Sequence, residues 1–269
     1  MKDYIKQLIA DKSGALTKTS VVREYLHARI LQTFQESGIF LCWAFQGGTA
    51  LRFLYSIPRF SEDLDFSLYD SSKSIPFRKA IENVKSVFEA ENYSLRLKVN
   101  DTKTVASAFV RFDGLLFELG ISPRRTQVLS IKIDVDTNPP SGATYSSTLI
   151  RRYVTLNLLH HDKASLLAGK MAAVLTRSYV KGRDLYDLVW YLADRTWPPP
   201  NLELLNAALK QTRWEEPTAT PRNWRDILLD RVTHINWDKA RADVRPFLER
   251  ENDIDLVTED NCVKLLRTA

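Results

Sequence analysis

Two aspartates on one face of a single short segment constrain this chain more than any other feature. The segment 63–68 reads DLDFSL, and its alternation of polar and apolar residues is typical of a strand. Because successive side chains of a strand point to opposite faces, Asp63, Asp65 and Ser67 share one face while the apolar residues face a core. Neighbouring carboxylates repel each other, and a pair of this kind commonly holds a divalent cation. The segment therefore predicts a metal-binding strand within a sheet.

A glycine pair lies a short distance before that strand. Gly47, Gly48 and Thr49 follow the apolar run 39–45 and open a helical pattern. Backbone N–H groups at a glycine-rich turn into a helix suit a phosphate, and the Thr49 hydroxyl can donate a further hydrogen bond. A strand-to-helix turn that merely needs glycine is the simpler explanation. Together with the two aspartates, however, the turn predicts an enzyme that transfers a nucleotidyl or phosphoryl group.

A third carboxylate is expected from the alternating segment 129–136, LSIKIDVD. Its polar face carries Lys132, Asp134 and Asp136. We favour Asp134 as a metal ligand because it is mid-strand, where it can lie beside the strand of Asp63 and Asp65. Asp136 is the alternative ligand, although its closeness to the loop 138–142 also suits a turn cap. Taken alone, Asp134 fits an ordinary solvated strand face equally well.

A second polar cluster follows in the helical half of the chain. Lys170 interrupts the apolar stretch 166–175, where a lysine is costly unless it faces a cleft or an anion, and it could pair with triphosphate oxygens. Asp184 follows Arg183 at the start of the next helical pattern, and Asp187 lies on the same face. Helix capping is the competing explanation for both acids. We expect Lys170 and Asp184 to complete the active site across a domain boundary.

Composition sets the broad class of protein. The 269 residues have 44% hydrophobic content and a net charge of +5, which is compatible with a polyanionic partner. Cys42 and Cys262 are far apart and lack metal-ligand spacing, so no disulfide framework is expected. With no signal peptide and no apolar run long enough to span a membrane, we expect a cytoplasmic protein without membrane contact.

The order of patterns predicts an α+β fold with a mixed sheet and flanking helices, followed by an all-helical part. We place the sheet-bearing catalytic domain, with its N-terminal helices, at residues 1–158, and the helical domain that completes the site at residues 159–269. His160 and His161 are expected in a loop, and His27 and His234 carry no special chemistry. The expected helices span residues 17–36, 47–55, 75–91, 162–176, 182–194, 202–211, 222–229, 237–249 and 258–266. The expected strands span residues 39–45, 63–68, 94–99, 104–112, 115–121 and 127–136, with Asp113-Gly114 as a hairpin turn and a short extended piece at 152–156.

These motifs together resemble the AbiEii-type nucleotidyltransferase toxins of abortive-infection and type IV toxin–antitoxin systems, within the DNA-polymerase-β-like superfamily. The likeness runs from about residue 20 to 195. It rests on GGTALR at 47–52, SEDLDF at 61–66, IKID at 131–134, and the motif of Lys170, Arg177 and RDLYDL at 183–188. Thr49 stands where many superfamily members have serine, which keeps the hydroxyl.

The resemblance implies a minimal nucleotidyltransferase domain with a helical companion. It implies dependence on Mg²⁺ or Mn²⁺, an NTP as substrate, and a cognate antitoxin encoded nearby. Asp63, Asp65 and Asp134 would be the metal ligands, and with Lys170 and Asp184 the catalytic residues. Nucleotide contacts are assigned to Gly47, Gly48, Thr49, Arg52, Lys170, Arg183 and Asp187.

The acceptor is not fixed by these motifs. Some relatives add nucleotides to the 3′ end of tRNA, so an RNA acceptor and a block of translation are the leading hypothesis. Cations scattered through residues 210–245 also lean toward RNA. Transfer to a protein or a small molecule is the alternative. A non-catalytic nucleotide-binding protein that acts through a partner is a third hypothesis, against which the clustered acids argue.

Overall fold

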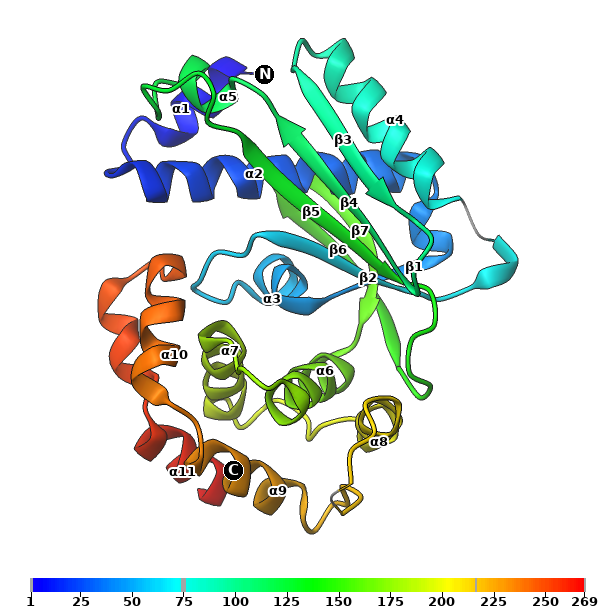
Figure 1. The fold of residues 1–269 in the computed structure, drawn as a ribbon, viewed down its shortest axis with the longest axis vertical. Coiled ribbons are helices and arrows are strands. Elements are labelled where there is room, and N and C mark those ends of the chain that lie inside the picture. The colour runs from blue at the N-terminus through cyan, green and yellow to red at the C-terminus, as the bar shows by residue number, and fades with distance from the viewer. Residues whose placement is uncertain (1, 74–75, 216, 269) are drawn as a thin grey trace. The chain divides into compact units, whose positions relative to one another are not determined.

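The computed structural model describes residues 2–73, 76–215 and 217–268, and Figure 1 shows the order of their elements. The chain divides into two compact units. The first comprises residues 1–54, 60–138 and 147–160, and the second comprises residues 55–59, 139–146 and 161–269. The α-helices are α1 (Lys2–Ile9), α2 (Ala15–Glu36), α3 (Gly47–Tyr55), α4 (Phe77–Ala90), α5 (Leu115–Glu118), α6 (Lys163–Thr176), α7 (Gly182–Ala193), α8 (Leu202–Gln211), α9 (Trp224–Thr233), α10 (Trp237–Val244) and α11 (Glu259–Thr268). The strands are β1 (Trp43–Gln46), β2 (Asp63–Leu68), β3 (Leu95–Asn100), β4 (Val105–Phe112), β5 (Leu129–Asp136), β6 (Tyr145–Arg152) and β7 (Val154–His161).

Within the described residues these strands form one seven-stranded mixed sheet in the order β3-β4-β5-β2-β1-β7-β6. Strand β2 is antiparallel to β1 and parallel to β5, and β1 is parallel to β7. Strands β3, β4 and β5 pair antiparallel in sequence order. The two strands that carry the predicted metal ligands, β2 and β5, are therefore immediate neighbours near the middle of the sheet. This architecture confirms the expected α+β class with a mixed sheet and flanking helices.

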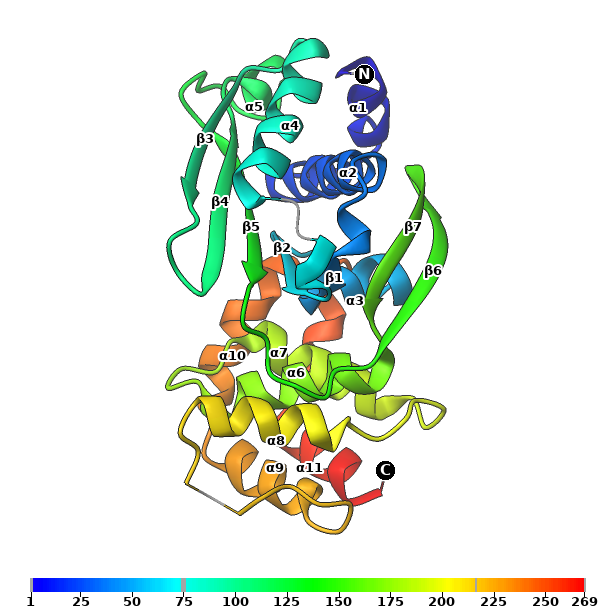
Figure 2. The same ribbon diagram turned by 90° about the vertical axis from the view of Figure 1, so that its right-hand side faces the viewer.

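One face of the sheet is the core of the first unit. Helix α4 packs on β3 and β4 and helix α2 packs on β5, and Figure 2 shows both helices on the same face of these strands. The ring of Phe66 in β2 lies 5.3 to 5.9 Å from the rings of Phe34, Trp43 and Phe45. Because Phe66 is anchored in this aromatic cluster, strand alternation turns Asp65 to the opposite face.

The second unit is built mainly from α6 to α11. Among the described residues, side chains cap four helices of this unit: Asp162 accepts from the Ser165 N–H at the start of α6, Asn201 from that of Leu204, Asn236 from that of Lys239 and Thr258 from that of Asn261. Gly182 permits a close approach of α7 to α10, since a Cβ there would lie 1.8 Å from the Ala240 carbonyl oxygen.

Residues 55–59 belong to the second unit, to which they are bound by main-chain hydrogen bonds. Arg59 forms an antiparallel bridge with Leu248, and the Pro58 carbonyl accepts a hydrogen bond from the Glu249 N–H over 3.2 Å. Nothing in the local sequence pattern anticipates that this short segment clusters with the helices.

Several local expectations are wrong. The apolar residues 115–121 include the helical turn α5 rather than a strand, and Gly114, at φ +69°, precedes that helix instead of closing a hairpin. Residues 39–45 are a 3₁₀ turn (Ile39–Leu41) followed by the shorter strand β1. His160 and His161 are buried at the end of β7, not in a loop. Strand β6 and helix α1 were not expected, and the predicted helix start at residue 75 lies outside the described residues.

Cys42 and Cys262 are both buried thiols, and the Cys42 thiol donates to the Ile39 carbonyl over 3.3 Å. No helix of the described chain has the length and apolar character needed to cross a membrane.

Candidate functional site

The predicted metal ligands of the first unit lie side by side on neighbouring strands. In the parallel pairing of β2 with β5, Asp65 is the register partner of Asp134, and Asp63 is the partner of Lys132. Side chains of register partners share a face, so the three carboxylates extend from one surface of the sheet. Asp136 is one step further along, opposite Ser67, and accepts a hydrogen bond from the Asn138 N–H over 3.0 Å. This contact is that of a turn cap, which was the alternative interpretation of Asp136 to a metal ligand.

Lys132 neutralises part of this acidic face. Its Nζ lies 2.5 Å from Asp134 Oδ2. Burial lowers the pKa of Lys132, but the hydrogen bond to Asp134 and the charges of Asp134, Asp63 and Asp65 outweigh burial and raise the pKa above its usual value. A lysine that is held protonated by three acids indicates that this patch favours cations.

The other carboxylate oxygen of Asp134 is suited to bind a metal ion. Asp134 Oδ1 is buried and finds no hydrogen-bond partner among the residues that the structure describes, which is a costly state for a carboxylate oxygen. Oxygen atoms of carboxylates are the donors that Mg²⁺ and Mn²⁺ prefer, so the residues present fit such an ion. Among the described residues, however, no three acidic, histidine or cysteine side chains already surround one point. The convergence of Asp63, Asp65 and Asp134 on one metal thus stays a prediction.

The glycine turn lies directly against the Asp65 carboxylate. Gly47 has φ +78°, and a Cβ built on it would lie 2.5 Å from Asp65 Oδ2. Only glycine combines this backbone conformation with so close an approach. The first glycine of the motif is therefore needed to let α3 begin beside the Asp65 carboxylate.

Thr49 and Arg52 have structural contacts in addition to their predicted roles. Thr49 is fully buried, and its hydroxyl donates to the main-chain carbonyl of Asp63. Since a hydroxyl has one proton to donate, the predicted phosphate contact of Thr49 requires that its side chain change partner or that its backbone N–H bind instead. The Arg52 Nε donates to Glu24 over 2.5 Å, in a pair where both side chains are less than 10% exposed. Nucleotide binding by Arg52 also stays a prediction.

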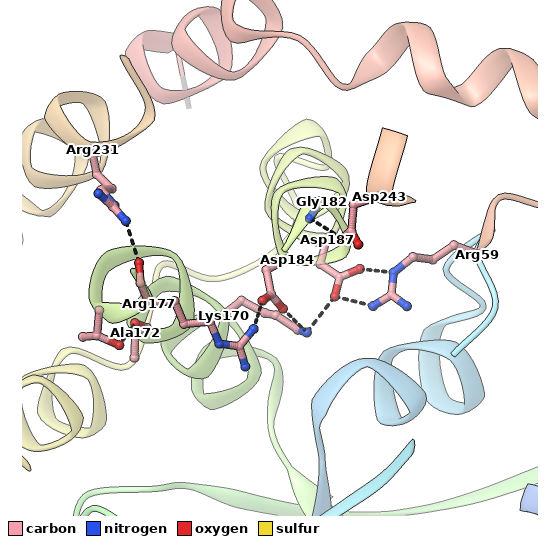
Figure 3. Close-up of polar contacts among 10 residues, drawn as sticks. Arg59, Lys170, Ala172, Arg177, Gly182, Asp184, Asp187, Arg231 and Asp243 are labelled. Atoms are coloured by element: carbon pink, nitrogen blue, oxygen red, sulfur yellow. Dashed lines mark hydrogen bonds and ion pairs between the residues drawn. The ribbon is translucent and has the colours of Figure 1, made fainter. Parts of the chain in front are cut away.

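In the second unit, Lys170 is held between two carboxylates (Figure 3). Its Nζ lies 2.9 Å from Asp184 Oδ1 and 2.8 Å from Asp187 Oδ2, and its side chain is 14% exposed. The expectation that a lysine in this apolar helix faces an anion is therefore met by the two aspartates of α7. Asp187 is fully buried within α7, so its ion pairs rather than helix capping account for it.

Arg59 completes the same network. Its Nε and Nη2 donate to the two oxygens of Asp187, each over 2.5 Å, and its side chain is 2% exposed. Burial lowers the pKa of the guanidinium, but the Asp187 carboxylate outweighs burial and the net pKa is raised. Arg59 stands four residues before Asp63 in the sequence.

The charges of the network hold Asp184 ionised. Burial raises the pKa of the Asp184 carboxyl, whereas Lys170 and Arg177 lower it by a larger amount, so that its pKa lies below the usual value. For Lys170, burial lowers the pKa of the ammonium, but the two aspartates raise it by a larger amount, so that the net pKa lies above its usual value. Arg59, Lys170, Arg177, Asp184 and Asp187 thus form a charged cluster with a formal charge of +1.

Backbone contacts fix the elements that carry this cluster. Arg231 of α9 donates to the carbonyls of Val174 and Arg177, which joins it to the end of α6. The Gly182 N–H donates to Asp243 over 2.8 Å at the start of α7. Arg183 stacks its guanidinium 4.2 Å from the ring of Phe247, so the structure gives it an aromatic partner, and its nucleotide contact stays a prediction.

Sequence reasoning missed Arg59 as a member of this cluster. The signal that could have found it is an arginine next to Pro58 and Phe60, in a short segment just before the paired aspartates. Nothing in the pattern names its partner, because Asp187 is 128 residues away in the chain.

Comparisons with known proteins find a family and solved structures that this chain resembles. Residues 29–259 match the family described as nucleotidyl transferase AbiEii toxin of a type IV toxin–antitoxin system. Among solved structures, the nucleotidyltransferase toxin MenT4 from Mycobacterium tuberculosis has a TM-score of 0.62 at 14% identity, over 100% of this chain and 90% of that one. JHP933 from Helicobacter pylori has a TM-score of 0.52 at 18% identity, over 92% of this chain and 89% of that one. A comparison with curated proteins finds no match.

Proposed function

This chain belongs to the AbiEii family of nucleotidyltransferase toxins, and we propose that it transfers a nucleotide from an NTP to the 3′ end of an RNA, with tRNA as the favoured acceptor. In this reaction the acceptor 3′-hydroxyl loses its proton to water and its oxygen bonds to the α-phosphorus, the bond between the α-phosphorus and the oxygen that bridges to the β-phosphorus breaks, and pyrophosphate leaves. Blocked tRNA would stop translation, which accounts for a toxin.

The observation that supports this reaction best is the register of β2 and β5, which pairs Asp65 with Asp134 next to Gly47. We propose that Asp63, Asp65 and Asp134 hold one or two Mg²⁺ or Mn²⁺ ions. Such ions neutralise charge on the phosphates and favour the ionised form of an acceptor hydroxyl. The backbone N–H groups of Gly48 and Thr49, at the start of α3, are proposed to bind phosphate oxygens.

Lys170 is proposed to contact the phosphates of the nucleotide. Its ammonium has three hydrogens, and the two aspartates of α7 occupy two of them. A lysine that its neighbours hold in one orientation can present the remaining hydrogen to an anion with little loss of side-chain entropy. In this proposal Asp184 and Asp187 are positioning residues, and Arg59 acts through Asp187.

A cognate antitoxin is the expected protein partner, as the type IV toxin–antitoxin family implies. It is expected to relieve toxicity when both proteins are produced together in the cytoplasm.

The test is incubation of the purified protein with each of the four labelled NTPs, Mg²⁺ and total cellular RNA. Transfer of label to tRNA-sized RNA, abolished by EDTA, is the expected result, and sequencing of the labelled 3′ ends identifies the acceptor. Label on protein, with none on RNA, would contradict the RNA acceptor. The variant Asp65→Asn is the control for contaminating transferases.

A further inference from the structure

A row of cations with an aromatic ring among them extends across the sheet from the carboxylates. We infer that Lys98, Phe109 and Arg111, here called the cation–aromatic strip, bind the single-stranded end of the acceptor RNA. This inference rests on the proposed function for its choice of RNA, and it assigns residues that no motif singles out. All three residues belong to β3 and β4 of the first unit.

The strand register places the strip on the same face as the metal ligands. Phe109 is the partner of Lys132 in β5 and of Lys98 in β3. Lys132 is in turn the partner of Asp63, so Asp63, Lys132, Phe109 and Lys98 form one continuous row across four strands. At about 4.8 Å between strands, the row reaches roughly 14 Å from the carboxylate strand.

The burial pattern along β4 shows that the strip is on the face of the sheet opposite to helix α4. Ala106, Ala108, Val110 and Phe112 are buried, whereas Phe109 and Arg111, between them, are only half-buried. Phe112 packs on Phe88 of α4, with ring centroids 5.3 Å apart. Phe109 and Arg111 therefore point away from α4.

The charges of this face are only partly compensated. Arg96 pairs with Asp113, and Lys132 pairs with Asp134. Lys98 and Arg111 form no ion pair within the described part of the chain, although the charge of Arg111 also acts on the Asp113 carboxylate that pairs with Arg96. Like charges that are close on one sheet face destabilise it, so a bound polyanion would relieve their repulsion.

The aromatic ring indicates which polyanion fits. Phe109 is between two lysines in its row, and the Arg111 guanidinium lies 5.9 Å from its ring centroid. A half-buried ring with cations on either side can bind a single nucleic-acid strand, because a base stacks on the exposed part of the ring while phosphates meet the cations. A free triphosphate has no need of a row that leads away from the metal ligands. An acceptor strand does need one, because its 3′ end must lie at the metal and its preceding nucleotides must lie elsewhere.

Binding of a fluorescent single-stranded RNA oligonucleotide to the full chain, without NTP, tests the inference. The variants are Phe109→Leu and the double variant Lys98→Gln with Arg111→Gln. The matched control is Lys79→Gln, an exposed lysine of α4, the helix that packs on the opposite face of the sheet. Thermal unfolding of each variant excludes a loss of fold.

We expect Phe109→Leu to weaken RNA binding about tenfold, as the loss of one stacked base does. The double variant should reduce the slope of log K against log salt by about 1.4, because each lost phosphate contact of a single strand contributes about 0.7. Lys79→Gln should change neither quantity. The affinity for NTP with Mg²⁺, measured by calorimetry, should be equal in all variants.

Two results would overturn the inference: RNA binding that the strip variants weaken no more than the control does, or an equal loss of NTP affinity, which would assign the strip to the nucleotide. Failure of the proposed function is distinguishable from both. RNA binding that depends on the strip, without nucleotide transfer to any RNA, would contradict the reaction and support the strip. A wild-type protein that transfers nucleotides to RNA and has strip variants as active as the control would support the reaction alone.

Discussion

Asp65 and Asp134 are direct register partners on the parallel strands β2 and β5, although 69 positions separate them in the sequence. Lys132 offsets only part of the repulsion between their carboxylates, and within the described chain one buried oxygen of Asp134 has no hydrogen-bond partner. The pair is consequently arranged at a cost in stability that a bound cation would offset.

The first prediction concerns these two residues. Asp65→Asn and Asp134→Asn should each lower nucleotide transfer by about 10²–10³-fold or more, as the loss of a group that stabilises charge in the transition state does. Without metal, Asp65→Asn should unfold at the same temperature as the wild type or a higher one, because charge repulsion is removed, whereas Asp134→Asn also loses the ion pair with Lys132. A saturating Mg²⁺ concentration, about a hundredfold above Kd, should stabilise the wild type by about 2.7 kcal/mol and the variants by less.

Asp136→Asn is the matched control for the third ligand. Its carboxylate accepts the Asn138 N–H at the turn, so its loss should lower stability slightly and leave transfer within a few-fold of wild type. Transfer that survives in Asp134→Asn and is lost in Asp136→Asn would show that Asp134 is the wrong choice.

The second prediction separates two costs of replacing Gly47. Gly47→Ala introduces strain at φ +78° and also a clash with the Asp65 carboxylate. Gly120→Ala introduces similar strain at φ +68°, but a Cβ there meets nothing within 4 Å. Both variants should lose about 1 kcal/mol of stability from the backbone. Only Gly47→Ala should also lose most of its transfer activity and Mg²⁺ response. Equal activities in the two variants would contradict the role of Gly47 in placing Asp65.

The third prediction concerns pH. His27 is buried, its Nε2 donates to the Glu62 carbonyl over 3.0 Å, and burial lowers its pKa to about 3. The nearby charge of Arg23 adds to this effect. Between the unfolded pKa of about 6.5 and the folded pKa, the unfolded chain binds a proton that the folded chain does not. Stability should therefore fall as the pH decreases from about 6.5, by up to about 1.4 kcal/mol per pH unit from this residue.

Urea unfolding of the wild type and of His27→Gln between pH 7 and pH 4 measures this effect. The side-chain amide of the variant can still donate to the Glu62 carbonyl but does not titrate, so His27→Gln should show a shallower dependence on pH. His234→Gln, at an exposed position, is the control and should have the wild-type slope. Identical slopes for wild type and His27→Gln would contradict the prediction.

Sequence periodicity predicted the elements that have one strong pattern of their own. The alternation at 63–68 and 129–136 and the apolar stripes of α2, α6 and α8 are local, so their types and approximate bounds follow from the residues alone. Residues 115–121 show the limit of this approach. They are apolar at nearly every position, which fits a buried strand or a buried helix, and tertiary contacts made them partly helical.

The parts of the candidate site that could not be predicted depend on long-range contacts. The pairing of Asp65 with Asp134 depends on the order of the strands in the sheet, which the sequence pattern does not give. In the structure, β5 follows β3 and β4 in an antiparallel meander and then pairs in parallel with β2. Arg59 and Asp187 are an extreme case, because neither residue's neighbours carry information about the other. Lys170 could be predicted because an unpaired charge in an apolar helix is energetically costly, and the isolated lysine is evident from the sequence alone.

The last prediction tests whether Lys170 contacts substrate or only joins α6 to α7. In Lys170→Met, Asp184 keeps its ion pair with Arg177 and Asp187 keeps both hydrogen bonds from Arg59, so neither carboxylate is left without a cation. The loss of stability should therefore be smaller than in Arg59→Gln, which removes both hydrogen bonds that the guanidinium donates to Asp187 and leaves this buried carboxylate with Lys170 alone.

If Lys170 contacts the phosphates, Lys170→Met should lower transfer by about 10²–10³-fold per folded molecule and weaken NTP binding measured by calorimetry. Lys170→Arg should not restore full activity, since a planar guanidinium cannot replace a compact ammonium between Asp184 and Asp187. Lys210→Met, an exposed lysine of α8 in the same unit, should behave as wild type in both assays. A Lys170→Met protein that melts earlier, yet binds NTP and turns over at the wild-type rate below its melting temperature, would restrict Lys170 to a structural role.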